Sequence, residues 1–195
     1  ILRKPPLEGE VWRGSTLKYM ITEIAKLAFL SRQRQLEQHN THGAELQQSA
    51  LLHLINRAKD TLYGTQHNFT AISNYEDFAK NVPVNTYEEV KEYIDCMRHG
   101  ERDILWPGQV RWYAKSSGTT ADKSKFIPVS AEGLQDTHYA GGKDAVALYL
   151  MQNPKSRLFD GRAMILGGSH APNYNLPNSL VGDLSAILIE NINPL

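Results

Sequence analysis

The stretch Lys115-Ser116-Ser117-Gly118-Thr119-Thr120-Ala121-Asp122-Lys123-Ser124-Lys125 decides how the rest of this 195-residue chain is interpreted. Serine and threonine hydroxyls surround one glycine, and two lysines follow. An apolar segment rich in aromatic and β-branched residues lies on each side, Val110–Ala114 before the loop and Phe126–Val129 after it. Such flanks predict two strands joined by a polar loop.

The composition of this loop suits a polyphosphate. Gly118 lets the backbone approach an anion and reach a positive φ, and successive N–H groups in such a turn form an anion-binding nest. Hydroxyls add donors and lysines add compact positive charge. The alternative is a solvated polar hairpin loop, and composition alone leaves both open. The order of residues excludes the common nucleotide loops, because no window fits G-x-x-x-x-G-K-[ST] or G-x-G-x-x-G.

A second candidate segment is Gly167-Gly168-Ser169-His170. It follows Ala163–Leu166, an apolar run that predicts a buried strand. Ligands of α/β sheets bind near the carboxyl ends of strands, so a glycine pair followed by Ser169 and His170 is a candidate binding segment. The alternative for His170 is a histidine that caps a loop.

The order Ser-Ser-Gly-Thr-Thr-x-x-x-x-Lys followed by Phe-Ile-Pro-Val resembles the first ATP-binding motif of adenylate-forming enzymes. It is closest to the auxin-responsive acyl acid-amido synthetases, and several neighbouring segments are similar to the bacterial branch of that family. The resemblance covers about Leu51 to the last residue. One departure is Asp122, where family members often carry glycine. The neighbouring segments that carry the resemblance are Asp103–Gly108, Arg111–Lys115, Tyr139–Asp144, Leu166–His170 and Gly182–Ile189.

This resemblance implies an ATP-dependent ligase. A carboxylic acid and ATP form an acyl-adenylate, and an amino acid then attacks it to give an amide. It implies Mg²⁺ with the ATP and a phosphate-binding loop in which Lys123 or Lys125 supplies charge, Lys125 matching the family position and being the candidate catalytic residue. The implied ATP-binding residues are Ser116, Ser117, Gly118, Thr119, Thr120, Lys123, Lys125, Gly168, Ser169 and His170.

Two function classes stay open at this stage. The first is the ligase, with a CoA ligase as a variant that would share the loop. Because family members are much longer, the resemblance implies an incomplete N-terminal large domain over 1–195, without the C-terminal domain and inactive alone. The second class is a non-catalytic nucleotide-binding or interaction domain on the same scaffold. The acyl acid, the amino acid and the oligomeric state are not readable from the residues.

Composition argues against several kinds of partner and cellular setting. The formal net charge is zero and the pI is about 7.2, which argues against a nucleic-acid partner. A single cysteine, Cys96, excludes an internal disulfide and is expected to be a half-buried hydrophobic residue. No apolar run approaches the ~18 residues that span a bilayer, and no signal peptide is evident. A cytoplasmic protein without membrane contact is therefore expected.

Helical spacing and caps predict the remaining elements. Residues 1–14 are expected to be irregular, followed by a helix to about Gln38, a break at Asn40–Gly43, and a helix over Ala44–Leu62. The apolar stripe of the first helix, which includes Ile24 and Leu27, is expected to face a core. A partner-binding or membrane-surface helix is the alternative.

Further along the chain, caps mark four more helices. They are a short helix over 75–80 behind Asn74, a helix from the Thr86–Glu89 capping box to about His99, a long helix from Ser130 to about Gln152, and a last helix over 184–191 that could also be a strand. The adjacent glycines Gly141 and Gly142 suggest close approach by another segment.

The fold class that follows is α/β, with a helical N-terminal layer of about residues 15–100 and an α/β subregion of about 103–195. The resemblance identifies it as part of the large N-terminal domain of an adenylate-forming enzyme.

Overall fold

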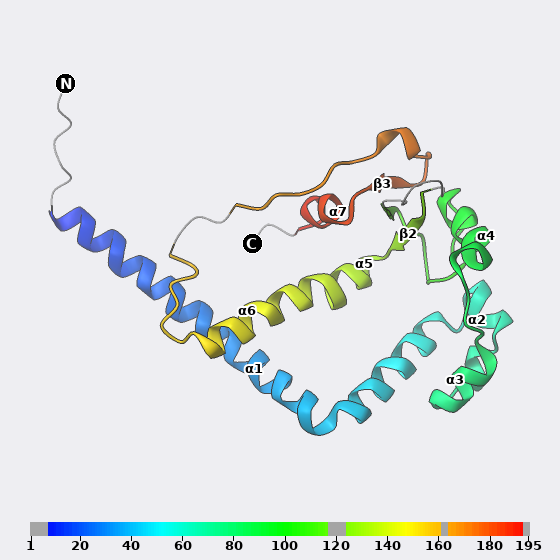
Figure 1. Ribbon diagram of the computed structural model, residues 1–195, viewed down its shortest axis with the longest axis horizontal. Helices are drawn as coiled ribbons and strands as arrows, with labels where there is room; N and C mark the ends of the chain where they lie inside the picture. The colour runs from blue at the N-terminus through cyan, green and yellow to red at the C-terminus, as the bar shows by residue number, and fades with distance from the viewer. Residues whose placement is uncertain (1–7, 117–123, 161–163, 193–195) are drawn as a thin grey trace. The chain divides into compact units, whose positions relative to one another are not determined.

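The computed structural model describes residues 8–116, 124–160 and 164–192, with side chains from residue 23 onward (Figure 1). The elements in chain order are α1 (Glu8–Ala58), α2 (Leu62–Gln66), η1 (Phe69–Ala71), α3 (Tyr75–Asn81), α4 (Tyr87–Arg98), β1 (Trp112–Lys115), β2 (Phe126–Val129), α5 (Ala131–Gly133), the π-helical η2 (Leu134–Tyr139), α6 (Ala140–Gln152), η3 (Pro172–Tyr174), β3 (Leu180–Gly182) and α7 (Leu184–Glu190).

Contacts group the chain into two compact units. Unit 1 comprises Ile1–His42 and Ala140–Ile165, and unit 2 comprises Gly43–Tyr139 and Leu166–Leu195. The candidate site lies in unit 2. Among the helices that are described, none is long and apolar enough to cross a membrane.

The N-terminal helix differs from the prediction at both ends. It begins at Glu8, so the expectation of irregular structure is wrong for residues 8–14, and it ends at Ala58 rather than Leu62. The predicted break is present as a single non-helical residue, His42, with φ −126° and ψ 25°. The residues on either side of His42 are helical, so the interruption is one residue long.

A polar contact joins the two helices of unit 1, and an aromatic contact joins α1 to the turn after α6. Arg32 of α1 donates two hydrogen bonds to Asp144 of α6. Nε donates to Oδ1, and Nη2 donates to Oδ2 at 2.8 Å. Phe29 stacks on Phe159 with ring centroids 6.3 Å apart. Ile24 and Leu27 are 61% and 65% exposed, so the expectation that their stripe faces a core is wrong for these residues.

The Arg32–Asp144 pair makes the stability of unit 1 depend on pH. The hydrogen bonds from Arg32 lower the pKa of Asp144. A lowered carboxylate pKa stabilises the fold at neutral pH, and that contribution is lost as the pH falls through the folded pKa, below the ordinary value of about 3.9. Asp144→Asn is therefore expected to cost about 1 kcal/mol at pH 7 in urea unfolding, since the pair is partly exposed. The difference from the wild type should shrink near pH 3. A constant difference would contradict this role.

Unit 2 is built on a three-stranded sheet in the order β2-β1-β3. β1 pairs antiparallel with β2, from Trp112 opposite Val129 to Lys115 opposite Phe126, which confirms the two predicted strands and shows that they form a hairpin. β1 pairs parallel with β3, with Ala114 beside Gly182. Strand β3 was not predicted, because its short sequence follows a loop rich in Asn and Pro. Its end brings residues 182–183 to the sheet edge from which the hairpin loop leaves.

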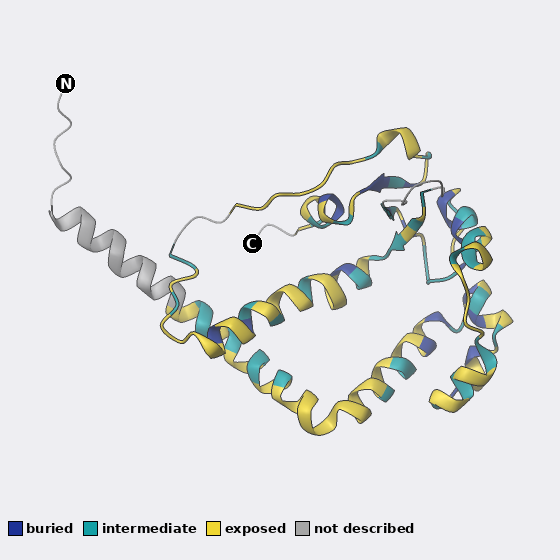
Figure 2. Cartoon of the chain, viewed as in Figure 1, coloured by how far each residue is buried: buried dark blue, intermediate teal, exposed yellow. Residues whose placement is uncertain are grey.

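One core cluster of unit 2 lies between α4 and one face of the sheet. Ile94 and Met97 of α4 pack with Tyr113 of β1 and Val181 of β3, and each is at most 3% exposed (Figure 2). Both predicted caps are present: Asn74 accepts from Asp77 N, and the Thr86–Glu89 capping box starts α4. The predicted stop at Gly100 is also observed, at φ 101°.

The predicted buried strand over 163–166 is the main error in the fold prediction; it is wrong for residues 164–166, and Ala163 lies outside the described residues. Met164, Ile165 and Leu166 are 83%, 68% and 82% exposed, and no described strand pairs with them. An apolar run becomes a buried strand only where a partner strand and a covering layer are available. The position beside Gly182 of β3 is occupied by His170, which forms an isolated antiparallel β-bridge with it.

The helix predicted from Ser130 to Gln152 is present, with Ser130 Oγ accepting from Gly133 N at 3.0 Å. Its second part is π-helical, and it then continues as α6. The suggestion of close approach at Gly141 and Gly142 is wrong within the described chain, since nothing there lies within 4 Å of a Cβ built at either residue. The last predicted helix is observed as α7, behind Asp183.

Candidate functional site

The hairpin positions both ends of the candidate loop. Ser116 N donates to Lys125 O at 3.0 Å, one step beyond the last strand pair. The two loop ends are therefore side by side at one edge of the sheet. The central part of the loop, with Ser117, Gly118, Thr119, Thr120, Asp122 and Lys123, lies outside the described residues.

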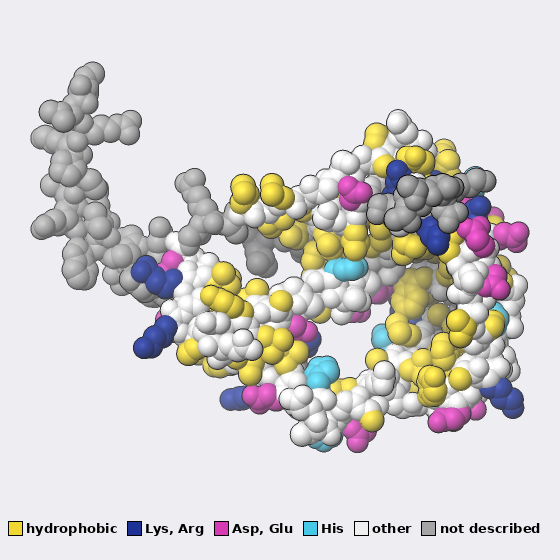
Figure 3. All heavy atoms as spheres, viewed as in Figure 1, with side chains coloured by type: hydrophobic (Ala, Val, Ile, Leu, Met, Phe, Trp, Pro, Cys, Tyr) yellow, Lys and Arg dark blue, Asp and Glu magenta, His cyan; other side chains and the backbone are white. Residues whose placement is uncertain are grey.

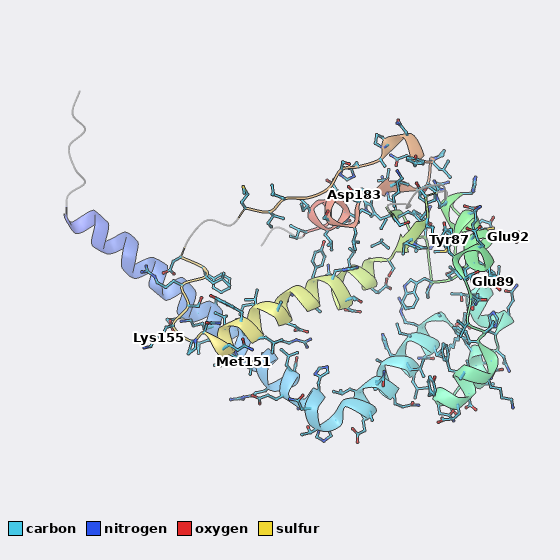
Figure 4. All side chains as sticks on the ribbon, viewed as in Figure 1. Tyr87, Glu89, Glu92, Met151, Lys155 and Asp183 are labelled. Atoms are coloured by element: carbon cyan, nitrogen blue, oxygen red, sulfur yellow. The ribbon has the colours of Figure 1, made fainter. Side chains whose placement is uncertain are left out.

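Lys125 is exposed, and the N-terminus of α4 supports it. Its Nζ lies 5.5 Å from the centroid of the Tyr87 ring. The Tyr87 hydroxyl accepts a hydrogen bond from Phe126 N at 2.9 Å (Figure 4). One tyrosine thus satisfies a backbone donor of β2 and presents its ring to the lysine ammonium.

The second predicted segment is tied to the start of α7. Ser169 N donates to Asp183 Oδ2 at 2.9 Å, and Gly168 N donates to Ser185 Oγ at 2.8 Å; Asp183 is labelled in Figure 4. A Cβ on Gly168 would overlap the Asp183 carboxylate, so only glycine fits here without movement. Since both amides are already bonded, the groups that this segment offers to a ligand are the Ser169 hydroxyl and the His170 ring.

His170 lies next to the sheet. It bridges Gly182 of β3, and its ring lies 5.7 Å from the Trp112 ring, centroid to centroid. Gly182 is beside Ala114, so the structure brings Ser116, Lys125 and the 168–170 segment to the same edge of the sheet. Ligand contact by His170 stays a prediction, with a histidine that caps the loop as the alternative.

Sequence reasoning missed a group of cations and rings on the α4 face of this edge. Arg98 stacks 3.9 Å from the Phe126 centroid, and Lys115 Nζ lies 4.4 Å from the centroid of Tyr174. Phe126 and Tyr174 are themselves 5.7 Å apart, centroid to centroid. Figure 3 shows lysine and arginine side chains (dark blue) gathered around this end of the hairpin. No sequence signal linked Tyr174, which lies in the Asn- and Pro-rich loop, to the hairpin.

The middle of β1 is buried. Tyr113 is fully buried, and this burial raises its pKa to about 12. Its hydroxyl donates to Val110 O at 3.1 Å. Tyr113 therefore serves as a neutral packing residue. The positive charges at this edge come from the lysines and Arg98, and Asp183 adds a carboxylate that accepts from Ser169 N.

A cavity of about 330 Å³ lies elsewhere, beyond the other end of β2. Trp106 and Leu54 line it, together with the ion pair between Arg57 and Glu132, whose atoms are 2.7 Å apart. None of the predicted site residues lines this cavity. The hairpin end, where the described residues Ser116, Lys125 and the 168–170 segment meet, is therefore the candidate site on chemical grounds.

These features define an α/β segment whose sheet edge carries a hydroxyl- and lysine-rich hairpin loop. The profile of the GH3 family N-terminal domain matches residues 32–190. The chain belongs to the GH3 family, which confirms the resemblance to the acyl acid amido synthetases.

Relatives in sequence and in structure agree. The indole-3-acetic acid-amido synthetase GH3.15 of Arabidopsis thaliana is 33% identical over 101 residues, 51% of this chain. GH3.17 of the same plant, also an indole-3-acetic acid-amido synthetase, is 32% identical over 102 residues. The solved GH3.15 acyl acid amido synthetase in complex with 2,4-DB superposes with a TM-score of 0.68 at 24% identity, over 86% of this chain and 28% of that one. The chain spans 17% of the length of each of these two curated relatives.

Proposed function

We propose that this chain is the phosphate-binding part of an ATP-dependent acyl acid amido synthetase. The observation that supports it most directly is the hairpin end, which holds Ser116 and Lys125 side by side in a chain of the GH3 family. Ligase activity is the family-level function of its relatives, which are named as amido synthetases. The proposal carries that reaction to this chain.

In the first half-reaction, a carboxylate oxygen attacks the α-phosphorus of ATP and pyrophosphate leaves. Negative charge grows on the leaving group, so fixed donors and cations at its oxygens stabilise the transition state. Lys125 supplies a cation and Ser116 a hydroxyl at the described ends of the loop. In the second half-reaction an amine attacks the acyl carbon and AMP leaves. Neither step requires a covalent bond to the protein.

The described residues suit an anionic substrate. Lys115, Lys125 and Arg98 form no ion pair with any carboxylate that the structure describes, so their charge is not cancelled there. Mg²⁺ would neutralise part of the triphosphate charge. No group of three or more potential metal ligands occurs among the described residues.

Acid-dependent ATP–pyrophosphate exchange tests the proposal. It is measured with a panel of carboxylic acids, on the chain itself and on the longest polypeptide encoded with it. Exchange that requires an acid supports adenylation and identifies the acyl substrate class. No exchange with any acid in either polypeptide would favour the alternative, a nucleotide-binding or interaction domain on the same scaffold.

A further inference from the structure

Lys115 stands at the β1 end of the candidate loop, opposite the Lys125 end. Side chains alternate along a strand, so Lys115 is on the same face as the buried Tyr113. Its pairing partner on β2 is Phe126, the residue that follows Lys125. Lys115 is the last residue of β1 and Lys125 directly precedes β2, so the two lysines stand at the two ends of the loop.

Aromatic rings hold three cations at this place. Tyr174 lies under Lys115, Phe126 under Arg98, and Tyr87 under Lys125. A ring face attracts a cation without cancelling its charge, whereas a carboxylate partner would neutralise it. Within the described parts of the chain, none of these cations has such a partner. The arrangement leaves positive charge available to an incoming anion.

Arg98 explains how Lys115 is placed. Its side chain is in the core at 9% exposure, its Nη2 donates to Tyr174 O at 2.7 Å, and its Nε has no described hydrogen-bond partner. Burying a guanidinium without a carboxylate is unfavourable. In this buried position, Arg98 contacts the ring of Phe126 and the backbone carbonyl of Tyr174, and so fixes both residues. Tyr174 in turn presents its ring to Lys115.

We infer that Lys115 is a second polyphosphate-binding cation at this loop, and that Arg98 is a positioning residue that acts on it through Tyr174. The inference deepens the proposed function and rests on it. The ligand chemistry is a linear polyphosphate, either the triphosphate of a nucleotide or free polyphosphate.

Titration calorimetry with inorganic tripolyphosphate tests the first part, because this probe requires only anion contacts. Lys115→Met keeps the length of the side chain and removes its charge. It is expected to weaken binding by about fivefold to tenfold at low salt and by less at high salt, where charges are screened. Lys80→Met, at an exposed lysine of α3, is the matched control and should leave binding unchanged.

A double-mutant cycle tests the positioning by Arg98. Arg98→Lys keeps the charge but loses the planar fork that reaches both Phe126 and Tyr174. It should weaken tripolyphosphate binding when Lys115 is present and have little further effect in the Lys115→Met background. A merely structural role would weaken binding equally in both backgrounds. If Arg98→Lys does not fold, Tyr174→Leu serves in the same cycle, since Tyr174 is 42% exposed.

The outcomes separate this inference from the proposed function. The same titrations with MgATP should show the same loss on Lys115→Met as with tripolyphosphate, because the contact is to phosphate. Wild-type binding that Lys115→Met leaves unchanged, or a loss seen with MgATP alone, overturns the inference but not the proposed function. A wild-type chain that binds neither ligand contradicts the proposed function and the inference with it.

Discussion

Lys125→Ala is expected to lower acid-dependent ATP–pyrophosphate exchange by about a hundred- to a thousand-fold, the usual effect of removing one group that stabilises developing charge. The ammonium stands at the end of the loop where pyrophosphate would leave, and the ring of Tyr87 directs it without cancelling its charge. Because the contact strengthens as charge develops, kcat should fall more than KM rises. The measurement is exchange rate against ATP concentration at a saturating acid, in whichever of the two polypeptides shows acid-dependent exchange.

Two controls separate this effect from damage to the fold. Lys125 is exposed and forms no ion pair among the described residues, so Lys125→Ala should leave the thermal unfolding midpoint near that of the wild type. Lys80→Ala removes another exposed lysine and should leave exchange unchanged. An exchange rate for Lys125→Ala within about twofold of the wild type, far below the usual effect of such a group, would remove Lys125 from the catalytic machinery.

Local signals in the sequence predicted most elements of the fold. The Thr86–Glu89 capping box, Asn74 and Ser130 each start the helix that was predicted, because a cap acts within one turn of its own residue. The two strands and the loop between them were predicted because the three segments are adjacent in the chain. Errors occurred where burial depends on distant partners. Leu166 is apolar but exposed, and β3 reads as a loop until β1 pairs with it.

The candidate site was likewise predicted in part, where its residues are consecutive in the chain. The loop was recognisable because its residues are consecutive, and Ser116 and Lys125 do lie together. The cations and rings beside it come from α4, β2 and the loop before β3, so no spacing in the sequence connects them. Arg98 in particular reads as an ordinary basic residue in the last turn of a helix. Its burial against Phe126 follows only from how α4 packs on the sheet.

Gly64→Ala is expected to destabilise unit 2 strongly, with a loss of about 3 kcal/mol. A Cβ at this position would overlap the carbonyl oxygen of Ala58 and lie 3.0 Å from the carbonyl oxygen of Lys59. The Ala58 carbonyl has little freedom to move away, because it accepts hydrogen bonds from both the backbone N and the Oγ1 of Thr61. Thr61 is itself buried and caps α2 by accepting from Gly64 N at 3.0 Å.

The cost at Gly64 is steric rather than conformational, since the residue lies inside helix α2, where alanine is otherwise favoured. Gly141→Ala provides the matched comparison. Nothing described lies within 4 Å of its added methyl, and the residue is in α6, so this change should stabilise the chain by about 0.5–1 kcal/mol. Urea unfolding followed by circular dichroism measures both. Two glycine-to-alanine changes of opposite sign would support the tight junction between α1 and α2, whereas a neutral Gly64→Ala would mean that the Ala58–Thr61 turn yields at little cost.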